Sequence, residues 1–141
     1  MIDKTSIGHR KFLIENVAAC GERIKNLSYS IEKNSALFPL SLGALNALNE
    51  DQKESIDALI LRFSQCVAMI QDQIFRGILL AAQEDVSDKS NRDKSLLMEK
   101  LGAIKSADEF GVAAVLRNKF AHFYPEQSQD QPLFIISNEA I

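Results

Sequence analysis

A stripe of apolar residues between positions 56 and 78 is the feature that most restricts how this chain can fold. Its members recur at steps of three and four residues, which is the spacing of one face of an α-helix. Asn49, followed by Glu50 and Asp51, is typical of a helix start, because such side chains complement the free N–H groups of the first turn. We therefore predict a helix from about residue 50 to Gln83, whose buried face is formed by Ile56, Leu59, Ile60, Phe63, Val67, Ile70, Ile74 and Ile78.

The same reasoning predicts three further helices. The first covers about residues 7–33, where apolar side chains again recur at steps of four and three. A short leucine-rich helix ends near Gly102. Ser106 and Glu109 have the spacing of a capping box, which starts the last helix, and Pro125 ends it.

The remaining segments are predicted to be connections between helices and a C-terminal tail. Segment 34–49 is rich in leucine and alanine but contains Pro39 and Gly43, so we predict a connection whose apolar side chains need covering, for example by a partner subunit. The polar run EDVSDKSNRD separates the second and third helices. After Pro125 the chain is polar and then apolar again, which predicts a flexible tail over 126–141 that docks or begins a helix.

These elements predict an all-α protein, most simply an up-and-down four-helix bundle. A chain of 141 residues fits one domain, residues 1–141, with its core in about residues 5–125. The longest apolar runs fall far short of the ~20 residues that span a bilayer, and the N-terminal residues lack the apolar region of a secretory signal. We expect a cytoplasmic protein without membrane contact, in which Cys20 and Cys66 are buried and reduced.

The net charge and the spacing of potential metal ligands exclude several classes of function. The formal net charge of −3 offers no broad basic surface for long nucleic acid, so DNA binding is not expected and any contact with a polyanion must be local. The two cysteines have no metal-ligand spacing, and there is no glycine-rich phosphate loop. We predict neither a metal site nor a cofactor.

The last predicted helix, from Ser106 to Pro125, has two different faces. At about 100° per residue its large apolar residues gather on one side and are predicted to enter the core. They are Val112, Val115, Leu116, Phe120 and Phe123. The other face places small residues between a cation and a potential base. It carries Ala114, Arg117, Asn118 and Ala121, with His122 at its border.

Arg117 and His122 are five residues apart, so an ideal helix separates them by about 140° and places them on the two flanks of a groove with an alanine floor. Asn118 lies one turn before His122 and can hydrogen-bond an imidazole nitrogen. Tyr124 follows the helix, and its hydroxyl can reach the same groove. A lone imidazole cannot easily serve as base and acid in one step, which suggests that two copies face each other across a twofold axis.

This set of residues suits phosphodiester chemistry that needs no metal. An imidazole can take a proton from a ribose 2′-hydroxyl or give one to the 5′-oxygen that leaves. Arg117 is always charged, and its fork can stabilise negative charge on the phosphorus in the transition state. An ordinary helix end explains the same residues, because arginine and protonated histidine complement the helix dipole. The spacing alone leaves both interpretations open.

Residues 117–124 resemble a motif of the HEPN superfamily, whose ribonuclease members carry arginine, four to six residues and then histidine, often extended to R-N-x-x-x-H-x-Y on the last core helix. Arg117, Asn118, His122 and Tyr124 match every element of the extended form. The segments IDALILRF and LGAIKSADEF make the chain similar to small HepT-like bacterial proteins over roughly residues 50–126.

The resemblance implies a homodimer and a metal-independent endoribonuclease, the toxin of a bacterial toxin–antitoxin pair. It implies His122 as general acid or base, Arg117 as phosphate binder and Asn118 as support. The usual partner is a nucleotidyltransferase of the MNT type, which acts as antitoxin and in some members attaches AMP to the tyrosine matched by Tyr124. Two alternatives stay open: a non-catalytic HEPN module that binds nucleotide or substrate for that partner, and a purely structural helical interaction protein.

Other polar residues are given structural roles. His9 is expected to be a solvated residue near the N-terminus. For Arg62 a salt bridge or subunit contact is favoured over a phosphate contact. Glu84, Asp85 and Asp88 are expected to be solvated loop charges without liganding geometry.

Overall fold

The computed structural model describes residues 4–85 and 87–123, and all regular secondary structure in that part is helical. The first long helix is α1 (Lys4–Asn34), followed by a 3₁₀ turn, η1 (Ser35–Leu37), and by the short α2 (Leu42–Asn46). Helix α3 (Glu50–Met69), the π-helix η2 (Ile70–Phe75) and α4 (Arg76–Ala81) follow one another without a break. Helices α5 (Asn91–Lys100) and α6 (Ala107–Phe123) complete the described chain. The prediction of an all-α protein is confirmed.

The continuous run from Glu50 to Ala81, called the α3–α4 rod below, begins where the sequence predicts. The Asn49 side chain accepts a hydrogen bond from the Gln52 N–H at 2.8 Å, and the Gln52 side chain accepts one from the Asn49 N–H at 2.9 Å. This reciprocal capping box satisfies two N–H groups that a helix start leaves unpaired. In the π-helical part, hydrogen bonds reach five residues back instead of four. Residues five apart, such as Ile70 and Phe75, therefore lie closer to one line than in an α-helix.

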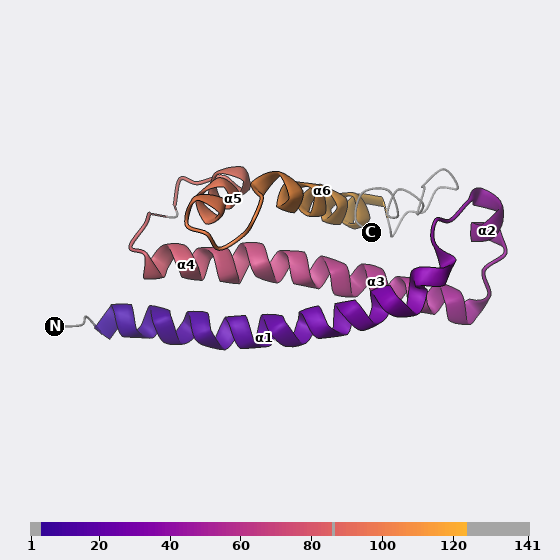
Figure 1. Ribbon diagram of the computed structural model, residues 1–141, viewed down its shortest axis with the longest axis horizontal. Coiled ribbons are helices and arrows are strands. Elements are labelled where there is room, and N and C mark those ends of the chain that lie inside the picture. Colours follow the sequence, from indigo (N-terminus) through magenta and orange to yellow (C-terminus); the bar gives the residue numbers. More distant parts are fainter. Residues whose placement is uncertain (1–3, 86, 124–141) are drawn as a thin grey trace.

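The α3–α4 rod is the middle layer of the molecule. Helix α1 runs antiparallel along one side of it, while α5 and α6 lie on the other side (Figure 1). Two apolar clusters hold these layers together. The first contains Leu40, Ile56, Ile60 and Leu116, and the second contains Phe75, Leu79 and Met98. Helix α5 departs from a regular up-and-down arrangement. It is seen nearly end-on in Figure 1, which means that its axis crosses the direction of the other helices.

The connection between α1 and the rod is covered by the chain itself. Leu40 is buried in the first cluster, and Leu37, Phe38 and Leu48 pack against that cluster. Leu42 stays exposed. The chain itself therefore covers part of this segment, because Leu37, Phe38, Leu40 and Leu48 pack at the start of the rod. Cover of the exposed residues by a partner subunit stays a prediction.

Cys20 on α1 and Cys66 on α3 are both buried and are not joined in a disulfide. Burial raises the pKa of each thiol, and the neighbouring Cys20 raises the pKa of Cys66 further. Because the thiolate is the reactive form, a raised pKa makes both residues poor nucleophiles at neutral pH. Their location is that of core residues, as the sequence predicts.

We expect alkylation of both cysteines to be slower in the native protein than in the urea-unfolded protein, by at least about tenfold, since the buried thiols react only when the fold opens locally. The rate in the native state is expected to rise with pH, because a higher pH increases the thiolate fraction. Intact-mass spectrometry over time measures both rates. Equal rates in the two states would show that the thiols are accessible.

Candidate functional site

The candidate site lies on α6, whose start is fixed by local hydrogen bonds. The Ser106 hydroxyl accepts a hydrogen bond from the Glu109 N–H at 3.1 Å, and the Ser106 carbonyl accepts one from the Phe110 N–H at 3.2 Å. Arg92 on α5 pairs with Asp108 at 2.6 Å, which ties the first turn of α6 to its neighbour. The helix start predicted from Ser106 is confirmed.

Two side chains anchor the second half of α6 to the α3–α4 rod. Leu116 is buried with Ile56 and Ile60, and Phe120 packs against the same cluster. The Phe120 ring meets Phe63 edge to face, with ring centroids 6.0 Å apart, an arrangement that aromatic pairs prefer. Because residues 116 and 120 are one turn apart, they fix the rotation of this half of the helix.

That rotation corrects part of the predicted core face. Leu116 and Phe120 face inward as expected, but Val112 and Val115 are 44% and 52% exposed. The first half of α6 instead packs through Ala107 and Phe110. An ideal helix places Val112 about 200° from Phe110, almost on the opposite side. Ala107 and Phe110 thus form the contact, and the two valines face solvent. The Phe123 side chain lies outside the described part.

Arg117 follows directly on the anchored Leu116. Its side chain is half-buried, and it has no hydrogen-bond or ion-pair partner among the residues whose side chains the structure describes. Ala114 is likewise half-buried, whereas Asn118 and Ala121 are exposed. The face predicted to carry the site is therefore covered along the flank with Ala114 and Arg117 and open along the flank with Asn118.

His122 lies in the last turn of α6, and its side chain is outside the described part, as is Tyr124. Because α6 is α-helical from Ala107 to Phe123, positions 117 and 122 are about 140° apart around its axis. Within one chain the two positions therefore diverge. The predicted contacts of Asn118 with His122, and of Tyr124 with the same groove, concern side chains outside the described residues.

The part of α6 from Phe110 onward has a charge opposite in sign to that of the whole chain. From Phe110 to Phe123 the sequence contains Arg117 and Lys119 but no aspartate or glutamate, although the net charge of the protein is −3. Lys119 is half-buried and takes part in an interaction of its own. Arg117 has no such interaction among the side chains that the structure describes.

Arg62 has a structural role. Its guanidinium donates hydrogen bonds to the Asn26 carbonyl at 3.1 Å and to the Ser30 hydroxyl at 2.8 Å, which joins the α3–α4 rod to α1. The interpretation as a structural contact is favoured, although the acceptors are neutral oxygens rather than a carboxylate. His9 departs from its predicted solvated position, because α1 already begins at Lys4 and His9 is half-buried within it.

The acidic loop after α4 contains a local hydrogen-bonded turn. The backbone N–H and the hydroxyl of Ser87 donate to the Asp85 carboxylate at 2.9 and 2.7 Å. These bonds lower the pKa of Asp85. Among the side chains that the structure describes, no three histidine, cysteine or acidic residues are grouped in a way that could hold a metal ion.

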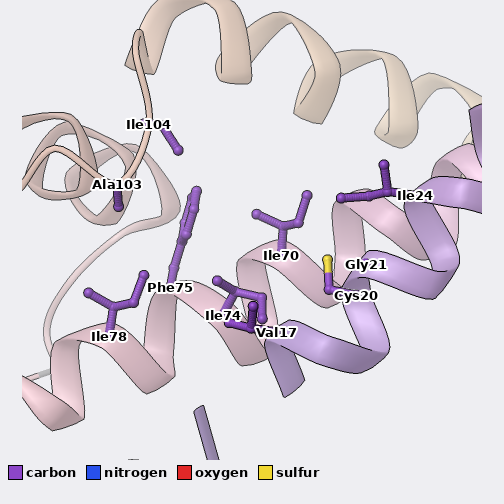
Figure 2. A pocket seen from close by; sticks show the side chains of 10 residues that line it. All are labelled: Val17, Cys20, Gly21, Ile24, Ile70, Ile74, Phe75, Ile78, Ala103 and Ile104. Carbon is purple, nitrogen blue, oxygen red and sulfur yellow. The ribbon is translucent and has the colours of Figure 1, made fainter. Parts of the chain in front are cut away.

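An apolar groove, which the sequence analysis did not predict, lies between α1 and the connection from α5 to α6 (Figure 2). Its volume is about 320 Å³. It is lined by Val17, Cys20, Gly21, Ile24, Ile70, Ile74, Phe75, Ile78, Ala103 and Ile104. Gly21, which interrupts the apolar stripe of the first helix, was the one sequence signal that this face is hollow.

Comparison with known proteins does not assign this chain to a family. Protein-family models, curated proteins and solved structures contain no match to the chain. In the described part of the chain, every helix is too short or too polar to cross a membrane.

Proposed function

We propose that this protein is a HEPN-type endoribonuclease that cleaves RNA without a metal ion. The observation that carries the proposal is the position of Arg117: it belongs to the R-N-x-x-x-H-x-Y motif and follows the anchored Leu116. Its guanidinium also has no hydrogen-bond or ion-pair partner among the described side chains. An arginine whose backbone is fixed by packing, and whose charge is not used within the described fold, is suited to bind a phosphate.

In the proposed reaction the ribose 2′-oxygen forms a bond to the adjacent phosphorus, and the bond from phosphorus to the 5′-oxygen breaks. The products are a 2′,3′-cyclic phosphate and a 5′-hydroxyl. His122 moves a proton, either from the 2′-hydroxyl or to the leaving 5′-oxygen. Arg117 stabilises the negative charge that develops on the phosphoryl oxygens. Asn118 supports the imidazole of His122.

A homodimer forms part of this proposal. Positions 117 and 122 diverge by about 140° on α6, so one chain alone does not direct both groups at one phosphate. Two copies that face each other supply an arginine from one chain and a histidine from the other on each side of the substrate. The second imidazole also provides the acid that complements the base.

We further propose that the enzyme is the toxin of a bacterial toxin–antitoxin pair in the cytoplasm, with a nucleotidyltransferase of the MNT type as antitoxin. The tyrosine of the motif, Tyr124, is the proposed target of that partner. Its hydroxyl would attack the α-phosphorus of ATP and release pyrophosphate. The attached AMP would add bulk and negative charge to the motif that contains Arg117, which disfavours RNA binding.

The second candidate is a non-catalytic HEPN module that binds nucleotide or substrate for the nucleotidyltransferase. The acidic net charge of −3 favours it, because only Arg117 and Lys119 offer positive charge between Phe110 and Tyr124. So few cations give weak, salt-sensitive affinity for a long RNA, whereas a single nucleotide needs fewer contacts.

One experiment distinguishes the two proposed functions. Purified protein is incubated with single-stranded RNA in the presence of EDTA, and the ends of the products are identified by mass spectrometry. The endoribonuclease is expected to yield 2′,3′-cyclic phosphate and 5′-hydroxyl ends. Intact RNA after long incubation, together with measurable nucleotide binding, would favour the binding module instead.

A further inference from the structure

Helix α1 carries apolar side chains that the described fold leaves uncovered. Ile14, Val17 and Ile24 are 69%, 51% and 46% exposed, and they lie on one flank of the helix together with Gly21. The cause is the layer order: α1 packs on the α3–α4 rod, while α5 and α6 pack on the opposite side. The apolar groove of Figure 2 opens beside this flank.

The groove has the chemistry of a docking site for apolar side chains. One wall is α1, the opposite wall is the connection with Ala103 and Ile104, and the floor is the π-helical η2 and the start of α4 (Figure 2). Every lining residue is apolar, a glycine or a cysteine, and no charged group is among them. Water in such a groove makes few hydrogen bonds, so covering it with apolar groups is favourable.

We propose that residues 133–136 of the same chain, Leu-Phe-Ile-Ile, occupy this groove. They are four consecutive apolar residues in a C-terminal segment that is otherwise largely polar, since residues 126–132 read EQSQDQP. An apolar run of this kind gains most from a site that is apolar throughout. Attachment to the same chain also gives the segment a high effective concentration at the groove, which a separate molecule lacks.

The length of chain after α6 matches the distance to be covered. Ala107, the first residue of α6, follows three positions after Ile104 in the groove wall. Phe123 lies 16 residues further on, which is about 24 Å along the helix axis. Residues 124–132 are nine in number and span at most about 30 Å when extended. They are therefore long enough to return Leu133 beside α6 to the groove.

A photo-crosslinking experiment on the full chain tests this placement. Phe134 is replaced with the photoreactive residue p-benzoylphenylalanine, the protein is irradiated, and the crosslinked peptides are identified by mass spectrometry. We expect crosslinks to α1 around Val17–Ile24 or to Ile70–Ile78, in a product with the mass of one chain. The same photoreactive residue at Gln129, in the polar part of the segment, is the control and is expected to miss the groove.

Filling the groove provides a second, independent readout. A Cβ added at Gly21 meets nothing within 4 Å, and the same holds at Gly8 on the same helix, outside the groove. Gly21→Leu is therefore expected to fold and to reduce the groove crosslink several-fold, whereas Gly8→Leu leaves the yield unchanged. Both substitutions increase helix propensity, so they are matched in that respect.

Three results would overturn the proposal. A crosslinked product with the mass of two chains would assign the groove to the segment of a second copy. Crosslinks confined to other parts of the same chain, or no crosslink at all, would show that residues 133–136 do not dock there. An unchanged groove crosslink in Gly21→Leu would likewise contradict the placement. None of these readouts depends on the ribonuclease activity.

Discussion

Arg117→Ala is expected to slow RNA cleavage by about 10²–10³-fold, the loss that follows removal of one group that stabilises transition-state charge. The rate is measured with purified protein and single-stranded RNA in EDTA. Arg117 is half-buried on α6, but the folded state is expected to survive, because the guanidinium has no hydrogen-bond or ion-pair partner among the side chains that are described. Unchanged circular dichroism and unfolding midpoint would verify this.

The same assay tests the role of His122, the other residue of the proposed catalytic pair. His122→Ala is expected to reduce the rate by about 10²–10⁴-fold, the usual contribution of a general acid or base. Mixing Arg117→Ala with His122→Ala protein gives a sharper test of the dimer. If each site takes arginine from one chain and histidine from the other, a mixed dimer holds one site with both residues but only one of the two imidazoles. Its activity is therefore expected to exceed that of either variant alone and to stay well below that of the unaltered protein.

A matched control separates the role of Arg117 from a general effect of charge. Arg76 is an exposed arginine on α4, outside the candidate site. Arg76→Ala removes the same charge and is expected to leave the cleavage rate within about twofold, because a single surface charge contributes weakly at physiological salt. An equal loss of rate in both variants would reject a specific role for Arg117, and an active His122→Ala protein would reject the catalytic assignment.

Helix boundaries were predictable from the sequence because local interactions set them. Asn49 and Ser106 each accept a hydrogen bond from an N–H three residues later, and Gly102 takes the positive φ of 81° that favours glycine after a helix end. Such features depend on a few neighbouring residues. They are visible in the sequence without any knowledge of the layers.

The orientation of α6 was not predictable in the same way. Val112 and Val115 have the spacing of core residues, yet they face solvent, because Ala107 and Phe110 form the contact of the first half of the helix. The spacing of apolar residues alone does not show which of them form the contact. That choice depends on where α5 and the α3–α4 rod lie, which is tertiary information.

The same limit applies to the candidate site and to the groove. The sequence placed Arg117 and Asn118 on one helix, and α6 keeps them there. It predicted that Leu116 and Phe120 enter the core, but not which residues of the α3–α4 rod they contact. The groove was missed because its lining comes from three separate segments, which only the assembled layers bring together.

Leu79→Ala is expected to lower the free energy of unfolding by about 3 kcal/mol, within the roughly 2–5 kcal/mol seen for leucine removed from a core. Leu79 is 0% exposed and lies with Phe75 and Met98 in the cluster that joins the α3–α4 rod to α5. Removal of its side chain leaves a cavity on the stiff central rod, where neighbouring helices cannot easily close in. Urea unfolding followed by circular dichroism measures the loss.

The rod itself offers the control for that measurement. Leu61 is 58% exposed on the same continuous run of helix, so Leu61→Ala makes the same chemical change and is expected to alter the free energy of unfolding by no more than about 0.5 kcal/mol. The comparison also bears on the proposed dimer. A loss at Leu61 that grows with protein concentration would place this residue in a contact between two copies, because association stabilises the folded state by mass action. A small loss at Leu79 would instead contradict the central position of the α3–α4 rod.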